Sequence, residues 1–81
     1  MATKCLALAL APHIQVNCIA PGIIDPQTGL TEEVGRRLCA RTPAGKLGDP
    51  DDVAEAVVYL ATCRDFITGQ IFSIDGGLGL K

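Results

Sequence analysis

Several kinds of residue are scarce in this chain, and their scarcity excludes whole classes of function. The 81 residues include no tryptophan, one tyrosine, two phenylalanines and one histidine, and the net charge is −2. Nucleic-acid binding normally needs a basic surface and aromatic rings on which bases stack, and the sequence offers neither. No apolar run approaches the about 20 residues that a membrane-spanning helix requires. We therefore expect no nucleic-acid partner and no membrane span.

The cysteines show no spacing typical of a metal site. Cys5, Cys18, Cys39 and Cys63 are far apart, no C-x-x-C occurs, and His13 is the sole histidine. Structural zinc sites normally use closely spaced pairs of ligands. We therefore expect no metal, and we interpret the cysteines as small apolar fillers in a protein of the reducing cytoplasm.

The size of the chain limits its stability. It forms one domain at most, and its 48% apolar and 20% charged residues are typical of a globular protein. In a compact chain this small, the free energy gained by burying apolar surface is about equal to the conformational entropy cost of folding. Because disulfides and metal are not expected, a partner surface is the remaining source of stability.

The first eleven residues allow more than one interpretation. They read M-A-T-K-C-L-A-L-A-L-A, in which Lys4 and the short apolar stretch imitate a secretory signal cleaved after Ala11. That stretch has the minimum length and overlaps its own cleavage site, so we favour a helix that Pro12 stops. The alternation of Leu and Ala would permit a strand, but neither residue is β-branched and both propagate helices well.

The rest of the chain predicts two strands with two helices between them. Residues 14–20 alternate as a strand that Pro21-Gly22 ends, and residues 70–74 form a second strand before Asp75. Thr31 can cap a helix that continues to about residue 41. A stronger signal predicts a helix at Pro50–Thr62, because Asp49 is a good N-cap and proline suits the first helical position. The apolar face of that helix is expected to contain Val53, Val57 and Leu60, widened by Ala54, Val58 and Ala61.

This order of elements, helix-strand-helix-helix-strand, predicts an α/β fold. A strand–helix–strand connection normally joins parallel strands, and parallel sheets are buried on both faces. Two strands cannot provide that cover alone. We therefore expect the edge of a larger, doubly wound parallel sheet, which makes the chain an incomplete domain.

Three stretches resemble motifs of the short-chain dehydrogenase/reductase family. Residues 14–24 read I-Q-V-N-C-I-A-P-G-I-I, similar to I-x-V-N-x-(I/V)-x-P-G-x-I. Residues 43–54 read P-A-G-K-L-G-D-P-D-D-V-A, similar to P-x-G-R-x-G-x-P-E-D-V-A. Residues 66–77 read F-I-T-G-Q-I-F-S-I-D-G-G, similar to (F/Y)-I-T-G-Q-x-x-x-(V/I)-D-G-G. The resemblance spans nearly the whole chain and corresponds to the last third of a 3-oxoacyl-[acyl-carrier-protein] reductase-like member.

The resemblance implies a Rossmann-type NAD(P)-binding domain, with residues 1–81 as its last third, that transfers hydride between NAD or NADP and a carbonyl or alcohol substrate. The family's phosphate loop, catalytic Ser and Tyr-x-x-x-Lys pair correspond to positions before this segment. Tyr59 is followed four residues later by Cys63 and is expected to pack near a helix end, while Lys4 matches another basic position of the family. We therefore assign no catalytic residue and expect the chain alone to be inactive.

One cofactor contact falls inside the chain on this resemblance. Pro21 and Gly22 shape a turn that faces the nicotinamide, and the backbone N–H of Ile24 would donate a hydrogen bond to its carboxamide. The chain departs from the family at Pro26, because a threonine hydroxyl commonly contacts the cofactor there. Thr28, two residues further on, is the alternative hydroxyl.

The glycines at positions 76, 77 and 79 do not form a dinucleotide-binding loop, since no helix follows to receive a pyrophosphate. We interpret them as a flexible terminal turn. The resemblance also implies a homo-oligomer formed through Pro50–Thr62 and residues 70–74. Two functions remain open: part of an NAD(P)-dependent oxidoreductase, or a non-catalytic piece that associates with a full-length homologue.

Overall fold

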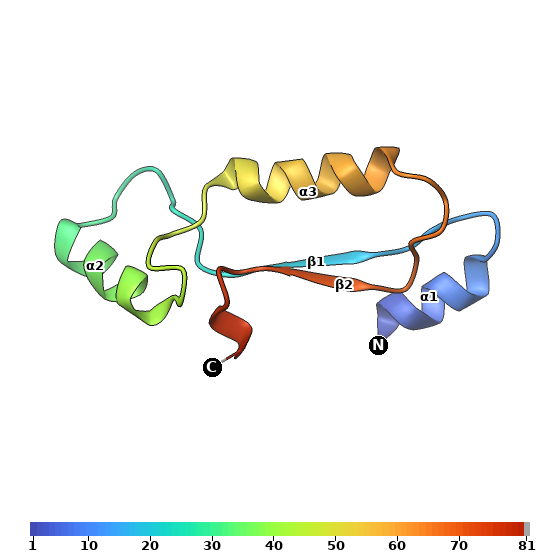
Figure 1. Cartoon of the computed structure of the whole chain (residues 1–81), viewed down its shortest axis with the longest axis horizontal. Coiled ribbons are helices and arrows are strands. Elements are labelled where there is room, and N and C mark those ends of the chain that lie inside the picture. Colours follow the sequence, from blue (N-terminus) through green and yellow to red (C-terminus); the bar gives the residue numbers. More distant parts are fainter. Residues whose placement is uncertain (81) are drawn as a thin grey trace.

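The computed structural model describes residues 1–80 and contains a parallel pair of strands with helices around it (Figure 1). The elements are α1 (Ala2–Leu10), β1 (Cys18–Pro21), α2 (Glu32–Arg41), α3 (Pro50–Thr62), β2 (Ile71–Ile74) and a 3-10 turn, η1 (Leu78–Leu80). β1 and β2 pair in parallel, with Cys18 opposite Ile71 and Pro21 opposite Ile74. The predicted order of elements and the parallel pairing are confirmed.

The helices surround the strand pair unequally. α3 lies along one face, whereas α1 lies beside the amino ends of the strands and α2 and η1 lie near their carboxyl ends (Figure 1). The middle of the other face has no helix over it among residues 1–80. This arrangement leaves one face of a parallel sheet without cover, although such sheets are normally buried on both faces.

Both predicted helix caps are confirmed. Thr31 Oγ1 accepts a hydrogen bond of 3.2 Å from the Val34 N–H at the start of α2. Asp49 and Asp52 form a reciprocal capping box at the start of α3, with Asp52 Oδ2 2.8 Å from the Asp49 nitrogen. Because the caps satisfy backbone N–H groups that have no partner within a helix, they fix where α2 and α3 begin.

Both strands are shorter than predicted at their amino ends. β1 begins at Cys18 instead of residue 14, and β2 begins at Ile71 instead of residue 70. Gly69 has φ +74, so the chain leaves the extended conformation just before β2. β1 also extends one residue further than predicted, to Pro21. Proline fits there because the Gly22 N–H bonds to Ile74, so the alternating pattern turns the Pro21 nitrogen toward the open edge.

The side of α3 that packs on the sheet is narrower than predicted. Val53, Ala56 and Leu60 are half-buried, whereas Val57 and Val58 are 50% and 60% exposed. Ala54 and Ala61, also predicted for this face, are exposed, and Ala56 was not predicted for it. A sheet of two short strands is too narrow to cover a wider helix face. The prediction that Tyr59 packs near the helix end is also wrong, because Tyr59 is 61% exposed.

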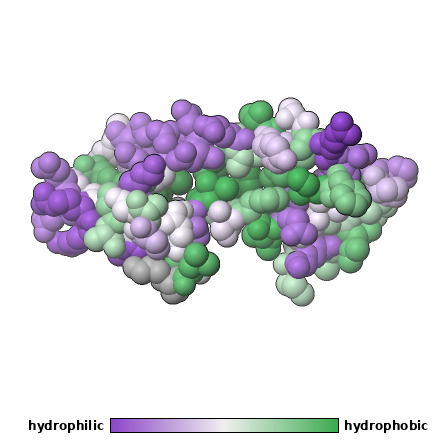
Figure 2. Space-filling model, in the orientation of Figure 1, coloured by the Kyte–Doolittle hydropathy of each residue, from purple (hydrophilic) through white to green (hydrophobic). Residues whose placement is uncertain are grey.

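Few side chains in the described residues are removed from water. Ala7 is the single buried apolar residue, and Thr42 is the single buried polar one. The molecule extends 48 × 24 × 19 Å with a radius of gyration of 15.4 Å, compared with about 12 Å for a compact chain of this length. Its accessible surface of 6076 Å² exceeds that of a compact chain of this mass by about 1,400 Å². Apolar surface appears as green patches along the centre of the molecule and around the notch below it (Figure 2).

The cysteine prediction is confirmed in part. All four cysteines are free, and three are half-buried, but Cys5 is exposed on α1 and fills no core. Residues 1–80 contain no group of acidic, histidine or cysteine side chains placed to hold a metal ion. In the same range, no helix has the length and apolar character needed to cross a membrane.

Candidate functional site

The carboxyl ends of β1 and β2 meet at Gly22 and Asp75. The Gly22 N–H donates to the Ile74 carbonyl at 3.1 Å, which continues the strand pairing by one residue. A Cβ at Gly22 would lie 2.6 Å from Asp75 Cβ and 2.7 Å from Asp75 Cα. Only glycine permits this approach, so the turn after Pro21 is fixed against the end of β2.

A second contact fixes the residues that follow this turn. Gly48 forms an isolated parallel bridge with Ile24, in which the Gly48 N–H donates to the Ile23 carbonyl at 3.0 Å and the Asp25 N–H donates to the Gly48 carbonyl at 2.8 Å. The Ile24 N–H itself points away from Gly48 and forms no hydrogen bond with any of residues 1–80. A rigidly held, unpaired donor therefore lies just beyond the carboxyl end of β1.

The loop beyond Ile24 has a defined shape. Asp25 Oδ1 accepts the Gln27 N–H at 2.8 Å, and Gln27 has φ +74. Pro26, Gln27 and Thr28 are all exposed. This Asx-type turn carries the chain past Pro26 and leaves the Thr28 hydroxyl in solvent.

The Asp75–Gly77 turn connects the carboxyl ends of the strands to the loop that follows α2. The Gly76 carbonyl accepts the Ala44 N–H at 2.9 Å, and a Cβ at Gly76 would lie 2.8 Å from Thr42 Cγ2. Asp75 accepts the N–H of Gly77 through Oδ1 and that of Gly79 through Oδ2, both at 3.0 Å. The expectation of a flexible terminal turn is therefore wrong, because the Asp75 carboxylate holds the glycines in a hydrogen-bonded turn. We call these three contacting segments, residues 21–25, 42–48 and 74–79, the carboxyl-end junction.

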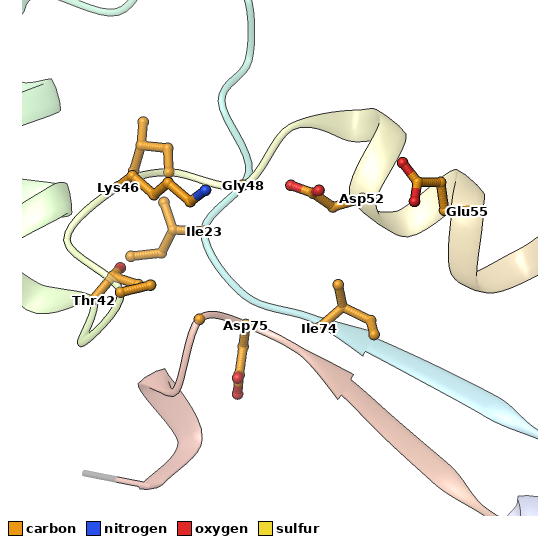
Figure 3. Close-up of a pocket in the computed structure, with 11 residues that line it drawn as sticks. Ile23, Thr42, Lys46, Gly48, Asp52, Glu55, Ile74 and Asp75 are labelled. Carbon is orange, nitrogen blue, oxygen red and sulfur yellow. The ribbon is translucent and has the colours of Figure 1, made fainter.

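A hollow of about 310 Å³ lies between the junction and α3. Ile23 and Ile74 form part of its apolar lining, while Lys46 borders it on one side and Asp52 and Glu55 on the other (Figure 3). Asp75 contributes to the wall, but its carboxylate points away toward η1 (Figure 3). The hollow is large enough for a small organic ligand, and its polar groups are of both signs.

The structure brings the three residues of the predicted cofactor turn together. Pro21 ends β1, Gly22 contacts Asp75, and Ile24 covers Gly48, where a Cβ would lie 2.7 Å from Ile24 Cδ1. Tyr59 on α3 and Lys4 on α1 are not part of the junction. The sequence did not predict that Gly48 contacts Ile24 or that Asp75 contacts Gly22. For Asp75 a signal was available, since an aspartate directly before two glycines is suited to bonding their backbone N–H groups.

Comparison with known proteins identifies the family. Residues 1–79 match the family model described as Enoyl-(Acyl carrier protein) reductase. A 3-oxoacyl-[acyl-carrier-protein] reductase of Thermotoga maritima is 41% identical over 80 residues, which are 94% of this chain and 32% of that protein. The curated relatives that the chain matches are thus about three times its length.

Solved structures agree in fold. A short-chain dehydrogenase of Leptospira borgpetersenii with bound NAD+ superposes with a TM-score of 0.82 at 37% identity, covering 95% of this chain and 30% of the solved one. ElxO with NADP bound superposes with a TM-score of 0.82 at 34% identity, covering 99% of this chain and 35% of the solved one. Sequence and structure together place this chain in the short-chain dehydrogenase/reductase family, where it is similar to the 3-oxoacyl-[acyl-carrier-protein] reductases.

Proposed function

We propose that this chain supplies the nicotinamide-facing turn of an NAD(P)-dependent oxidoreductase that moves hydride between the cofactor and a carbonyl or alcohol substrate. The observation that carries the proposal is the unpaired N–H of Ile24, held between two neighbours whose own backbone groups bond to Gly48. In open α/β sheets, ligands bind beyond the carboxyl ends of the strands, which is where this donor lies.

The residues present fit a nicotinamide. Its carboxamide oxygen can accept the Ile24 N–H, and Gly22 places no side chain in the turn below it. A bound NAD(P)H would supply the hydride, while the backbone of residues 21–24 would orient the ring. Pro26 has neither a hydroxyl nor an N–H, so we assign to the exposed Thr28 hydroxyl the second polar contact to the cofactor.

No residue of this chain is proposed to hold or move the reacting proton. Tyr59 is exposed on α3 and is not part of the junction, and Cys63 stands where a lysine four residues on would be needed. We therefore propose that the chain alone is inactive. Purified 81-residue chain should show no change in NADH or NADPH absorbance with a range of ketones, aldehydes and alcohols, and clear turnover would refute this.

A chimera tests the cofactor turn itself. Residues 1–81 would replace the matching segment of the Thermotoga maritima 3-oxoacyl-[acyl-carrier-protein] reductase, to which they are 41% identical. We expect NAD(P)H-dependent reduction of a 3-oxoacyl thioester. A folded chimera that binds no cofactor would contradict the proposal. A Pro26→Thr variant should bind the cofactor several-fold more tightly, since it adds one hydrogen-bonding hydroxyl.

The exposed apolar surface favours a second candidate function, that of a non-catalytic interaction piece. Val57, Val58 and Tyr59 on α3, and Ile71 on β2, are all at least half exposed. The accessible surface of the chain exceeds that of a compact chain of the same mass by about 1,400 Å². This excess is larger than the about 800 Å² that one partner contributes to a typical interface. We propose association through α3 and β2, either with another copy or with a full-length homologue.

Light scattering tests this association. We expect the purified chain to exceed the mass of 8.5 kDa calculated for a monomer, and Val58→Glu to reduce the observed mass. Glu32→Gln, on the exposed start of α2, is the matched control and should leave it unchanged. A monodisperse monomer would contradict self-association. Retention of a full-length homologue by the immobilised chain, lost in Val58→Glu, would identify the other partner.

A further inference from the structure

Asp75 occupies the point at which the proposed cofactor turn and the segment after α2 meet. On one side, Asp75 Cα and Cβ fill the space that a side chain at Gly22 would need, at 2.7 and 2.6 Å from the position of its Cβ. On the other side, the adjacent Gly76 carbonyl accepts the Ala44 N–H at 2.9 Å. A displacement of Asp75 therefore changes both contacts together.

The carboxylate of Asp75 fixes this point. The two oxygens accept from Gly77 and Gly79 at 3.0 Å each, and the Asp75 carbonyl accepts the Leu78 N–H at 3.1 Å. Gly76 and Gly77 have φ +60 and +92, values that a glycine-rich turn adopts but does not hold without support. A single anionic side chain therefore determines the conformation of a turn that would otherwise have many.

The turn transmits its position to the loop after α2 through close packing. A Cβ at Gly77 would lie 3.1 Å from Pro43 Cβ, and Thr42, beside Gly76, is the single buried polar residue of the described chain. The same loop continues to Gly48, which bridges to Ile24. A closed series of contacts thus runs from Asp75 through the loop after α2 to the unpaired Ile24 N–H.

We propose that Asp75 is a positioning residue, whose carboxylate sets the placement of the nicotinamide-facing turn relative to the segment that follows α2. This inference rests on the proposed function. We assign Asp75 no contact with the reacting atoms, because its carboxylate points toward η1 and accepts the N–H groups of Gly77 and Gly79 (Figure 3). Its effect passes through Gly22 on one side and Ala44 on the other.

Steady-state kinetics of the chimera provide the first test. Asp75→Asn keeps the size of the side chain but replaces one acceptor oxygen with an NH2 group, so either the Gly77 or the Gly79 N–H loses its acceptor. We expect KM for NAD(P)H and KM for the carbonyl substrate to rise together by about tenfold, because a displaced turn weakens the binding of the nicotinamide ring and of the substrate that must lie against it. Asp65→Asn, at an exposed position near the amino ends of the strands, is the matched control and should change neither.

The KM values distinguish positioning from a purely structural role. A residue needed only for folding would lower the amount of active enzyme, and therefore the maximal rate, with both KM values unchanged. That result for Asp75→Asn would overturn the inference while the active parent chimera upheld the proposed function. An inactive parent chimera would count against the proposed function instead.

Amide exchange in the 81-residue chain provides a test that does not depend on activity. Asp75→Asn should increase the exchange rates of the Gly22 and Ala44 amides by about tenfold relative to Asp65→Asn, because both amides bond to carbonyls that flank Asp75. Unchanged exchange at these two amides would overturn the inference. Full exchange of both amides at the unprotected rate in the unsubstituted chain would overturn it as well.

Discussion

At the amino ends of β1 and β2, polar side chains add hydrogen bonds to those of the backbone, whereas at the carboxyl ends glycines let neighbouring segments approach closely. Asn17 Nδ2 donates to the Ile67 carbonyl at 3.0 Å, and Asn17 Oδ1 accepts the Gln70 N–H at 3.1 Å. Thr68 Oγ1 accepts the Val16 N–H at 3.0 Å. These side-chain bonds accompany two backbone bonds, from the Gly69 N–H to the Val16 carbonyl at 2.7 Å and from the Cys18 N–H to the Gln70 carbonyl at 2.9 Å.

At the carboxyl ends, glycines rather than polar side chains mark where the segments meet. Gly22, Gly48 and Gly76 each approach a neighbouring segment so closely that a Cβ would lie within 2.8 Å of one of its atoms. The nearest atoms are Asp75 Cβ at Gly22, Ile24 Cδ1 at Gly48 and Thr42 Cγ2 at Gly76. The Ile24 N–H is left unpaired among residues 1–80. The carboxyl end therefore presents the Ile24 N–H as a backbone donor just beyond the strands, whereas the amino end is joined by hydrogen bonds of both backbone and side chains. This difference is why we place the cofactor at the carboxyl end.

The largest expected effect is that of Gly22→Ala. The new Cβ would lie 2.7 Å from Asp75 Cα, a backbone atom that cannot move without shifting β2. We expect a loss of about 3 kcal/mol of unfolding free energy in the chimera, measured by urea denaturation, together with weaker cofactor binding. Gly45→Ala is the control, because Gly45 has φ +75 but no atom within 4 Å of the new Cβ, and should cost about 1 kcal/mol. Equal losses in the two variants would show that the close approach at Gly22 is unimportant.

Asn17→Ala tests the amino end. The variant removes two hydrogen bonds that join segments 50 and 53 residues apart in sequence, so we expect a loss of about 2 kcal/mol. KM for the cofactor should not change, because the contact lies at the other end of the strands. Gln15→Ala, a neighbouring half-buried residue, should cost less than about 0.5 kcal/mol. A rise in cofactor KM in Asn17→Ala would break the distinction between the two ends.

Asp49→Ala should have a smaller effect. Asp49 caps α3 directly after Gly48, and its Oδ1 accepts the Asp51 N–H at 2.8 Å. Loss of the cap should cost about 1 kcal/mol and shorten α3 at the junction, as measured by circular dichroism and urea denaturation. Asp51→Asn leaves the capping box of Asp49 and Asp52 intact and should lower the unfolding free energy by only about 0.3 kcal/mol. A result in which the two variants are equivalent would show that the box does not stabilise α3.

The smallest effect is expected for Glu33→Gln on α2. Glu33 and Arg37 form an ion pair of 2.7 Å between side chains that are 69% and 71% exposed. Solvent screens such a pair, so its loss should cost no more than about 0.5 kcal/mol, and less at high salt. A loss above 1 kcal/mol would mean that α2 is coupled to the junction more strongly than its surface position indicates.

The sequence predicted the features whose causes are local. The caps at Thr31 and Asp49 depend on neighbouring residues, and both helices begin as predicted. The parallel pairing followed from the order of elements, and the turn that ends β1 followed from Pro21 and Gly22. Each of these depends on a short window or on a general rule of chain connection.

The features that the sequence did not predict depend on contacts between distant segments. The Ile24–Gly48 bridge and the packing of Asp75 against Gly22 join residues 24 and 53 positions apart. The burial of α3 was overestimated because its apolar pattern implies a wider sheet than these two strands provide. Val57 and Val58 belong to that pattern, and both are at least half exposed.

The most direct test uses isoleucine amides as reporters at both ends of the strands. The chain has seven isoleucines, of which Ile23 and Ile24 lie at the carboxyl end and Ile67 and Ile71 at the amino end. A chimera labelled with 15N-isoleucine only in residues 1–81 would be titrated with NADH and NADPH. We predict that the Ile24 amide resonance shifts most, with no shift at Ile67 or Ile71. A shift at Ile67 or Ile71 without one at Ile24 would contradict the placement of the cofactor at the carboxyl end.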